Sequence, residues 1–422
     1  MRSFLPGVDD AGWDAPGSNS LSDRLLAGAA ELRDSGPALR ALGERARMRA
    51  LAGLALAWRD PEDPFRREAL QLLPAECGLS SAMVERGIDD AFSVVTEQAL
   101  RYWWSTEAQG RPYQGRGEAP ELSGHIWASN VFVAGLPPVM ASLLVGSPAL
   151  IKAPASMPSF ACLLARSVRE HAPELGRCLG AAGWSRKQVA VTTTFLDGAD
   201  LLFAFGEDRS IEELRVQFQR PFYAFGARYS IAVLCSTVMG DDQQLDQLLD
   251  ALADDQLAWD GQGCLSPRWI FVEGSPELAQ MLAERAACRL PDRAELLPGT
   301  LLGDDDAAHR ASWLGQVGFS GWAREGRGWC CGAFDSSRLE PSPPPRSLCF
   351  VPLEDLDELA LLLTPLGSRL QGMSFFGPEK RREQLVEVLE PLGLSRVCEP
   401  GGLQRPPLHW SHDGVRILEA FC

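Results

Sequence analysis

The sequence predicts an α/β protein in which a helical N-terminal region precedes a parallel sheet covered by helices. Residues 18–104 repeat apolar side chains at helical spacing, with Pro or Gly between the repeats. From residue 125 onward, short apolar runs typical of strands alternate with helical segments, as in proteins built from parallel strands. A chain of 422 residues exceeds one ordinary core and indicates two or three domains.

The individual elements follow from these patterns. The expected N-terminal helices are 18–35, 37–59, 64–73 and 80–104. The expected strands are 125–132, 149–152, 189–193, 201–205, 222–225, 230–234 and 269–272. The later helices are 136–145, 156–171, 210–219, 245–257, 276–289, 356–363 and 378–392, with Ser156 as the N-cap of the second. Residues 293–345 carry no clear period and are expected to be irregular.

Composition excludes several classes of function. The net charge of -16 disfavours nucleic-acid binding, because phosphate contacts need a basic surface. The eleven cysteines form no C-x-x-C pair and no Cys/His cluster, so no metal site is expected. No signal peptide is apparent, and the longest apolar stretch, 131–146, contains two prolines and is too short to span a membrane. These features predict a cytoplasmic protein with free thiols.

One cysteine stands in an unusual place. Cys264 follows Gly261, Gln262 and Gly263, just before the apolar run 269–272. Glycines let the backbone approach another molecule closely, and nearby backbone N–H groups can stabilise a thiolate or an oxyanion. A thiol is also suited to forming an acyl intermediate. The turn by itself leaves two interpretations open, a nucleophile and a buried structural cysteine.

The stretch DGQGCLSP, residues 260–267, resembles the nucleophile segment of the bacterial acyl-CoA reductases known from bioluminescence, a branch of the aldehyde dehydrogenase superfamily. Further segments resemble that family in the same order: 125–154, 198–215, 222–234, 369–377 and 400–414. The resemblance implies an aldehyde dehydrogenase-like fold, with a Rossmann-like cofactor domain, an α/β catalytic domain and the nucleophilic thiol in the cleft between them. It also favours Cys264 as the nucleophile.

The resemblance implies roles for three more residues. Asn130 matches the asparagine whose amide stabilises the oxyanion. Lys152 matches the lysine that reaches the adenosine ribose of the cofactor, and Gly206 matches a glycine that lets the backbone approach the cofactor. Judged without the family, the three are equally consistent with a turn asparagine, a solvated lysine at a strand end and a turn glycine.

Ala155 bears on the choice of cofactor. Many NAD-dependent relatives carry a glutamate three residues after the lysine, where it binds the ribose 2'-hydroxyl and repels a 2'-phosphate. This chain has Ala155 followed by Ser156. The missing charge favours NADPH over NADH, and Ser156 with the N-terminus of its helix is expected to help hold the phosphate.

Two further departures bear on the reaction. Hydrolytic relatives place a glutamate base in the segment that matches residues 223–229, and this chain has no carboxylate there. Water attack on an acyl-enzyme is then poorly assisted, so thioester chemistry fits better than aldehyde oxidation.

The reductases usually have Gly-His in this segment, whereas this chain has Gly226-Ala227. His125 and His412 are candidates to replace that histidine, although a structural role suits both.

Together these features predict an enzyme that reduces an acyl thioester, carried by coenzyme A or an acyl carrier, to an aldehyde with NADPH. The expected domains are residues 1–228 with the helical region and the cofactor, residues 229–385 with the nucleophile, and a C-terminal segment, residues 386–422. The resemblance also implies an acyl-activating synthetase partner and a homo-oligomer. The alternatives are a non-catalytic acyl-binding or complex-forming protein, a CoA-acylating aldehyde dehydrogenase and an acyl-phosphate reductase.

Overall fold

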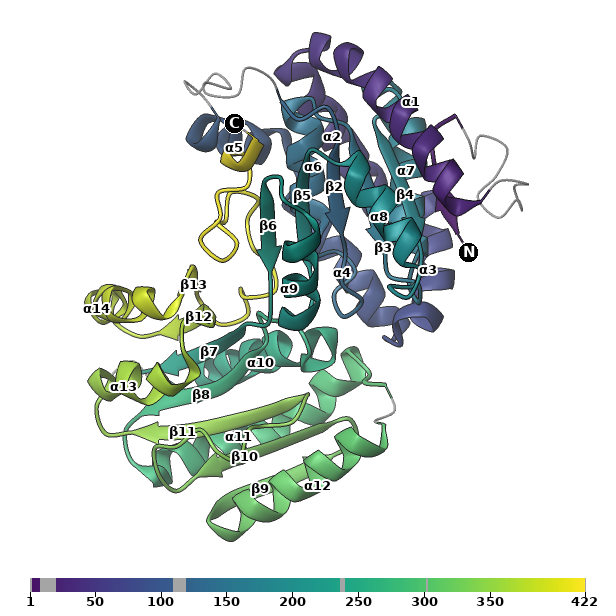
Figure 1. Ribbon diagram of the computed structural model, residues 1–422. Coiled ribbons are helices and arrows are strands. Elements are labelled where there is room, and N and C mark those ends of the chain that lie inside the picture. The colour runs from purple at the N-terminus through teal and green to yellow at the C-terminus, as the bar shows by residue number, and fades with distance from the viewer. Residues whose placement is uncertain (1, 8–19, 109–118, 236–239, 301–302, 422) are drawn as a thin grey trace. The chain divides into compact units, whose positions relative to one another are not determined.

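The computed structural model describes residues 2–7, 20–108, 119–235, 240–300 and 303–421. The chain forms two compact units (Figure 1). Unit 1 contains Met1–Gly226 together with Pro407–Cys422, and unit 2 contains Ala227–Pro406. No helix among the described residues is long and apolar enough to cross a membrane.

The N-terminal helices of unit 1 are defined by their caps. They are α1 (Leu21–Ala41), α2 (Glu44–Arg59), α3 (Pro64–Cys77), α4 (Ser81–Ser93) and α5 (Glu97–Glu107). The expected break before Pro37 is wrong, because α1 continues through that proline and the chain turns at Gly43, where φ is 77°. The expected single helix 80–104 is also wrong, because Thr96 accepts a hydrogen bond from Ala99 N and so starts a new helix.

The sheet of unit 1 has the strand order β1-β4-β3-β2-β5-β6. Its strands are β1 (Ser3–Phe4), β2 (Ser123–Ile126), β3 (Ala149–Ala153), β4 (Leu179–Gly183), β5 (Leu201–Phe205) and β6 (Phe222–Phe225). All neighbours pair in parallel except β1 with β4. From β2 the chain proceeds to β3 and β4 on one side and then to β5 and β6 on the other. This reversal creates a switch point between β2 and β5, where doubly wound sheets bind ligands.

Four helices connect these strands, namely α6 (Leu136–Val145), α7 (Ser159–His171), α8 (Val189–Gly198) and α9 (Asp208–Gln217). The expected strand 189–193 is wrong, because its β-branched residues begin α8. The strand of this crossover is β4, whose sequence LGAAG carries no β-branched side chain. It lies in the sheet because its small residues are fully buried between neighbouring strands, so tertiary packing overrides local propensity here.

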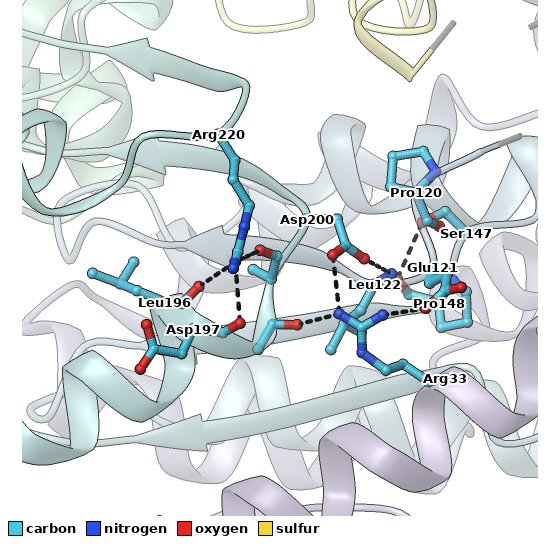
Figure 2. Close-up of polar contacts among 12 residues, drawn as sticks. Arg33, Pro120, Glu121, Leu122, Ser147, Pro148, Leu196, Asp197, Asp200 and Arg220 are labelled. Atoms are coloured by element: carbon cyan, nitrogen blue, oxygen red, sulfur yellow. Dashed lines mark hydrogen bonds and ion pairs between the residues drawn. The ribbon is translucent and has the colours of Figure 1, made fainter. Parts of the chain in front are cut away.

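Two arginines form hydrogen bonds at the amino edge of this sheet, where its parallel strands begin (Figure 2). Arg33 donates to Asp200 Oδ1 at 3.0 Å, and Asp200 Oδ2 accepts from Leu122 N at 3.0 Å. Arg220 donates to the carbonyls of residues 196, 197 and 199, where α8 ends. Carbonyls at the end of a helix lack partners within the helix. Arg220 supplies donors to these carbonyls, so this edge of the sheet has a structural role.

The sheet of unit 2 has the strand order β13-β12-β7-β8-β11-β10-β9 (Figure 1). Its strands are β7 (Tyr229–Leu234), β8 (Pro267–Glu273), β9 (Gly321–Gly326), β10 (Trp329–Phe334), β11 (Ser347–Leu353), β12 (Leu370–Phe376) and β13 (Arg396–Cys398). All neighbours pair in parallel except β9 with β10.

The helices of unit 2 are α10 (Asp242–Leu257), α11 (Pro276–Leu296), α12 (Asp304–Phe319), α13 (Leu359–Leu363) and α14 (Glu379–Leu389). The expected irregular region 293–345 is wrong, since it contains α12, β9 and β10. The sequence signal failed because this part of the chain mixes Gly, Arg and Cys without a clear period. The strand β10 is nevertheless fully buried, and its cysteines behave as small apolar residues.

Candidate active site

Three of the predicted cofactor and oxyanion residues lie at the carboxyl edge of the unit 1 sheet. Lys152 is the fourth of the five residues of β3, and it pairs in register with Ile126 at the end of β2. Gly206 directly follows β5. Asn130 is exposed in the turn after β2, because the expected strand 125–132 ends at Ile126. Asn130 and Gly206 therefore follow the two strands that flank the switch point.

Lys152 is partly buried next to an aromatic ring. Its Nζ is 5.9 Å from the ring centroid of Trp184, which follows β4. Burial lowers the pKa of its ammonium group. Within the described part of the chain, no carboxylate forms an ion pair with it. An ammonium that is partly desolvated and not neutralised by the protein suits hydrogen bonds to ribose hydroxyls or an interaction with a phosphate.

The turn after β3 differs from the prediction. Ala155 and Ser156 are exposed in this turn, and α7 begins three residues later with Pro158 as its N-cap. The expected N-cap role of Ser156 is wrong, because Pro158 disfavours helical geometry at the residue before it. The first amide of α7, Ser159 N, donates to the carboxylate of Glu76 at 3.1 Å. That amide therefore binds a carboxylate of the protein itself. At Ser156 only the side-chain hydroxyl could bind a phosphate, because the helix does not start there.

The backbone at Gly206 leaves room for a ligand. A Cβ added there would meet only the Cβ of Ser210, at 4.0 Å, so nothing in the protein requires glycine at this position. Glu207 and Asp208 begin the following helix, and their charge makes that helix N-terminus unsuited to phosphate. The open backbone at Gly206 and the ammonium of Lys152, which has no carboxylate partner among the described residues, could together hold a dinucleotide at this edge.

Cys264 belongs to unit 2 and lies in the turn between α10 and β8. A short 3-10 helix, Ala258–Gly261, precedes it, and the cysteine is only partly buried. Its carbonyl accepts a hydrogen bond from Ser230 Oγ on β7 at 2.8 Å. Ser266 N donates to Gly263 O at 2.9 Å and closes the turn around the cysteine. The backbone at Cys264 and in the two residues after it is therefore held by hydrogen bonds.

The segment 400–404 supports this turn from the C-terminal part of unit 2. Gln404 Nε2 donates to Asp255 O at 2.7 Å and to Ser266 Oγ at 3.3 Å. The buried carboxylate of Asp255 accepts from Gly401 N at 2.7 Å and from Leu403 N at 3.1 Å. These bonds join the end of α10, the segment 400–404 and the turn that carries Cys264 (residues 260–266) into one assembly.

The family model for acyl-CoA reductase (LuxC) matches residues 63–422. The chain belongs to this family. Solved structures share the fold of this acyl-CoA reductase at low identity. Aldehyde dehydrogenase 21 from Physcomitrella patens, in complex with succinate, has a TM-score of 0.71 and 14% identity over 100% of this chain and 93% of that one. Gamma-glutamyl-gamma-aminobutyraldehyde dehydrogenase from Burkholderia cenocepacia has a TM-score of 0.73 and 12% identity over 100% and 94%. Comparison with curated proteins gave no match.

Membership and fold together define the class of enzyme. The fold is aldehyde dehydrogenase-like, with two largely parallel sheets and many helices, as the sequence predicted. This acyl-CoA reductase is an aldehyde-forming oxidoreductase that acts on an acyl substrate.

Two histidines were candidates to replace the histidine that the reductases usually have where this chain has Ala227. His125 is buried in β2, stacked on Phe203 at 5.5 Å between ring centroids, and its Nε2 is 2.9 Å from Ser123 Oγ. Burial lowers the pKa of His125 to about 3, so it stays neutral in the core. His412 packs against the ring of Phe225 at 4.6 Å in unit 1.

Sequence reasoning missed the residues that hold the turn that carries Cys264. Ser230, Asp255 and Gln404 had no predicted role, although Gln404 lies in a segment that resembles a family motif. A motif shows that a segment matters but not which other segment it contacts. The predicted residues Asn130, Lys152, Ser156 and Gly206 all lie in unit 1, and Cys264 alone of the predicted set lies in unit 2.

Proposed function

We propose that the chain reduces an acyl thioester to an aldehyde with NADPH, through an acyl group bound covalently to Cys264. The observation that carries this proposal is the placement of Cys264, a partly buried thiol in a glycine-rich turn of an acyl-CoA reductase chain. Core cysteines of the same unit, such as Cys331 and Cys349, are fully buried in strands, and burial raises their thiol pKa.

In the first step the Cys264 sulfur attacks the thioester carbonyl carbon. The Asn130 amide and the Cys264 backbone N–H donate hydrogen bonds to the oxygen as it becomes negative. The bond from carbon to the carrier sulfur then breaks, and the carrier leaves as a thiol, taking up the proton that the Cys264 thiol gave up on attack. The product is a new thioester on Cys264, so this step changes the acyl carrier but not the oxidation state of carbon.

Lys152, Ser156 and Gly206 would hold the cofactor, Lys152 through its ammonium and Gly206 through its open backbone. When bound, NADPH supplies the hydride that reduces the acyl carbonyl. The oxygen is held by Asn130 during this change, and cleavage of the bond to the Cys264 sulfur releases the aldehyde. Ala155 offers no negative charge to a 2'-phosphate, which favours NADPH over NADH.

The segment 223–229 supports reduction over hydrolysis. It contains no carboxylate, so no base is supplied there to activate water against the acyl-enzyme. A thiol needs less assistance than water, so coenzyme A or an acyl carrier is the proposed donor.

We further propose a cytoplasmic homo-oligomer, together with an acyl-activating synthetase that loads Cys264 directly.

NADPH oxidation with a panel of acyl-CoAs tests this function. Wild type should turn over, and Cys264→Ala should lose both turnover and the acyl adduct seen by intact-mass analysis. Cys288→Ala removes an exposed thiol on α11 and is the matched control, with both signals retained. Asn130→Ala should still form the adduct but lower kcat by about 100- to 1000-fold. A wild-type protein that forms no adduct with any acyl-CoA or acyl carrier would contradict the proposal.

A further inference from the structure

A buried ion pair lies at the upstream side of the nucleophile turn. Arg346 Nη1 donates to Asp260 Oδ1 at 2.8 Å, and the two side chains are 3% and 5% exposed. The other carboxylate oxygen, Asp260 Oδ2, accepts from Thr300 Oγ1 at 2.8 Å. Asp260 is the first residue of the stretch that resembles the family's nucleophile segment, and Cys264 is its fifth. Nothing in the mechanism above uses either charge.

The same guanidinium joins three other segments of unit 2. It donates to Leu257 O at 3.2 Å where α10 ends, and to Leu297 O at 2.8 Å where α11 ends. It also donates to Gly328 O at 2.5 Å, between β9 and β10. Carbonyls at helix ends have no partner in their own helix, so one side chain satisfies both ends. The planar fork of arginine can make these bonds simultaneously, whereas an ammonium cannot reach them all.

The backbone between α10 and Cys264 needs such support. Trp259 and Asp260 have φ values of 55° and 54°, and Gly261 follows with 69°. Residues other than glycine rarely adopt this left-handed geometry, and they retain it only where their surroundings impose it. A Cβ at Gly261 would lie 2.5 Å from the backbone N of Arg346. The turn therefore packs directly on the chain of Arg346, and only glycine fits at position 261.

We propose that Arg346 and Asp260 are positioning residues for Cys264. They hold three successive left-handed residues so that the backbone amides next to the thiol keep a fixed direction. Ser230 and Gln404 fix the downstream side, and the ion pair fixes the upstream side. The inference rests on the proposed function for its catalytic consequence, but the geometry of the thiol can be tested without any substrate.

The test measures the rate at which iodoacetamide alkylates Cys264 as a function of pH, by peptide mass spectrometry on the folded protein. Thr300→Val removes one hydrogen bond to the carboxylate, Asp260→Asn removes the negative charge but keeps an acceptor, and Arg346→Met removes the guanidinium. Each should raise the midpoint of the Cys264 profile, because amides that stabilise the thiolate lose their alignment. Exposed Cys288 in the same molecules is the internal reference and should not change. Arg346→Lys should be intermediate, since it keeps the charge but not all of the bonds.

Leu389→Ala, a core substitution on α14, is the control for a general loss of stability. It should lower the melting temperature and leave the Cys264 profile unchanged. In turnover assays Asp260→Asn should lower kcat about tenfold or more, with little change in KM for the acyl-CoA. The inference is overturned if Asp260→Asn and Thr300→Val fold but keep the wild-type alkylation profile. A shifted profile in a protein that never turns over would retain the inference and reject the proposed function.

Discussion

At the scale of single residues, the proposed preference for NADPH depends on one small side chain. Ala155 is exposed in the turn that follows β3, three residues after Lys152. Neither the helix that follows nor its first amide supplies a dedicated phosphate site, because Glu76 accepts from Ser159 N. The proposed preference for NADPH therefore depends on the absence of a negative charge more than on a constructed anion site.

We expect Ala155→Glu to reverse the cofactor preference. A carboxylate at this position would repel a 2'-phosphate and could accept a hydrogen bond from a ribose 2'-hydroxyl. The ratio of kcat/KM for NADPH to that for NADH should fall by roughly tenfold to a hundredfold, because close like charges cost more than 1 kcal/mol. Ala155→Gln, which has a similar shape and no charge, is the control. An unchanged ratio in Ala155→Glu would place the 2'-phosphate elsewhere.

A buried histidine predicts how stability depends on pH. His125 has a folded pKa of about 3 because burial disfavours its charged form, whereas an unfolded histidine titrates near its ordinary value of about 6.5. The unfolded state therefore binds the proton first, and the stability present above the unfolded pKa is lost as the pH falls below it. Between pH 7 and pH 5 this group should remove about 2 kcal/mol of unfolding free energy.

Urea unfolding of wild type and His125→Gln at pH 7 and pH 5 tests this expectation. The variant is less stable at pH 7, since it loses the ring stacked on Phe203, but it should lose less on acidification. If both proteins lose the same free energy between the two pH values, His125 is not the group responsible.

At the scale of elements, α10 and α11 are joined by a row of ion pairs. Asp242, Asp246, Asp250 and Asp254 recur every four residues on α10, and Arg285, Arg289 and Arg293 recur every four residues on α11. The spacing places each set on one face of its helix, so the row forms wherever the two helices run side by side. Hydrogen bonds from Arg285 lower the pKa of Asp246.

Removing the middle arginine should weaken unit 2 in a salt-dependent way. Arg289 contacts Asp250 at 2.5 Å and Asp246 at 3.1 Å, and both partners are partly exposed. Arg289→Met should cost no more than about 1 kcal/mol at low salt, because solvent screens such pairs. The cost should shrink at 1 M salt, and it should begin to fall below about pH 4 and be lost at lower pH, as Asp246, whose pKa is lowered, becomes protonated. Urea unfolding in low and high salt measures both effects. A loss independent of salt would indicate packing of the arginine stem instead.

At the scale of the whole molecule, the last residues of the described chain pack on unit 1, although the chain reaches them through unit 2. Glu107 at the end of α5 accepts a hydrogen bond from Leu418 N at 2.9 Å, and burial raises the pKa of Glu107. The ring of Phe421 stacks on Phe203 at 5.3 Å, and His409 contacts Tyr102 at 4.8 Å. Residues 407–421 are thus part of the core of unit 1.

Glu107→Ala should release this segment. It leaves a buried backbone N–H without its acceptor, which costs about 1–3 kcal/mol. Limited proteolysis should cleave within residues 407–421 faster than in wild type, whereas Glu107→Gln retains an acceptor and should resist. Equal cleavage of Glu107→Ala and wild type would show that the aromatic contacts alone hold the segment.

The sequence by itself determined the family, the fold class and the local position of Cys264. These conclusions depend on short-range signals, namely apolar periodicity, a glycine-rich turn and ordered segments that resemble one family. It also gave several elements their correct bounds, such as the helix 136–145 and the strand 222–225. The local signal failed for residues 189–193, where β-branched residues form a helix, and for β4, where small residues form a strand.

The tertiary structure decided what holds the turn that carries the proposed nucleophile Cys264. Arg346 contacts Asp260 across 86 positions of sequence, and Gln404 contacts Ser266 across 138. No local pattern encodes such a pair, because its energy arises only when distant segments are packed and the buried charges find their partners. The same reason explains the first amide of α7, Ser159 N. It donates to Glu76, a carboxylate on α3 that is 83 positions away, whereas local reasoning had assigned the start of this helix to a phosphate.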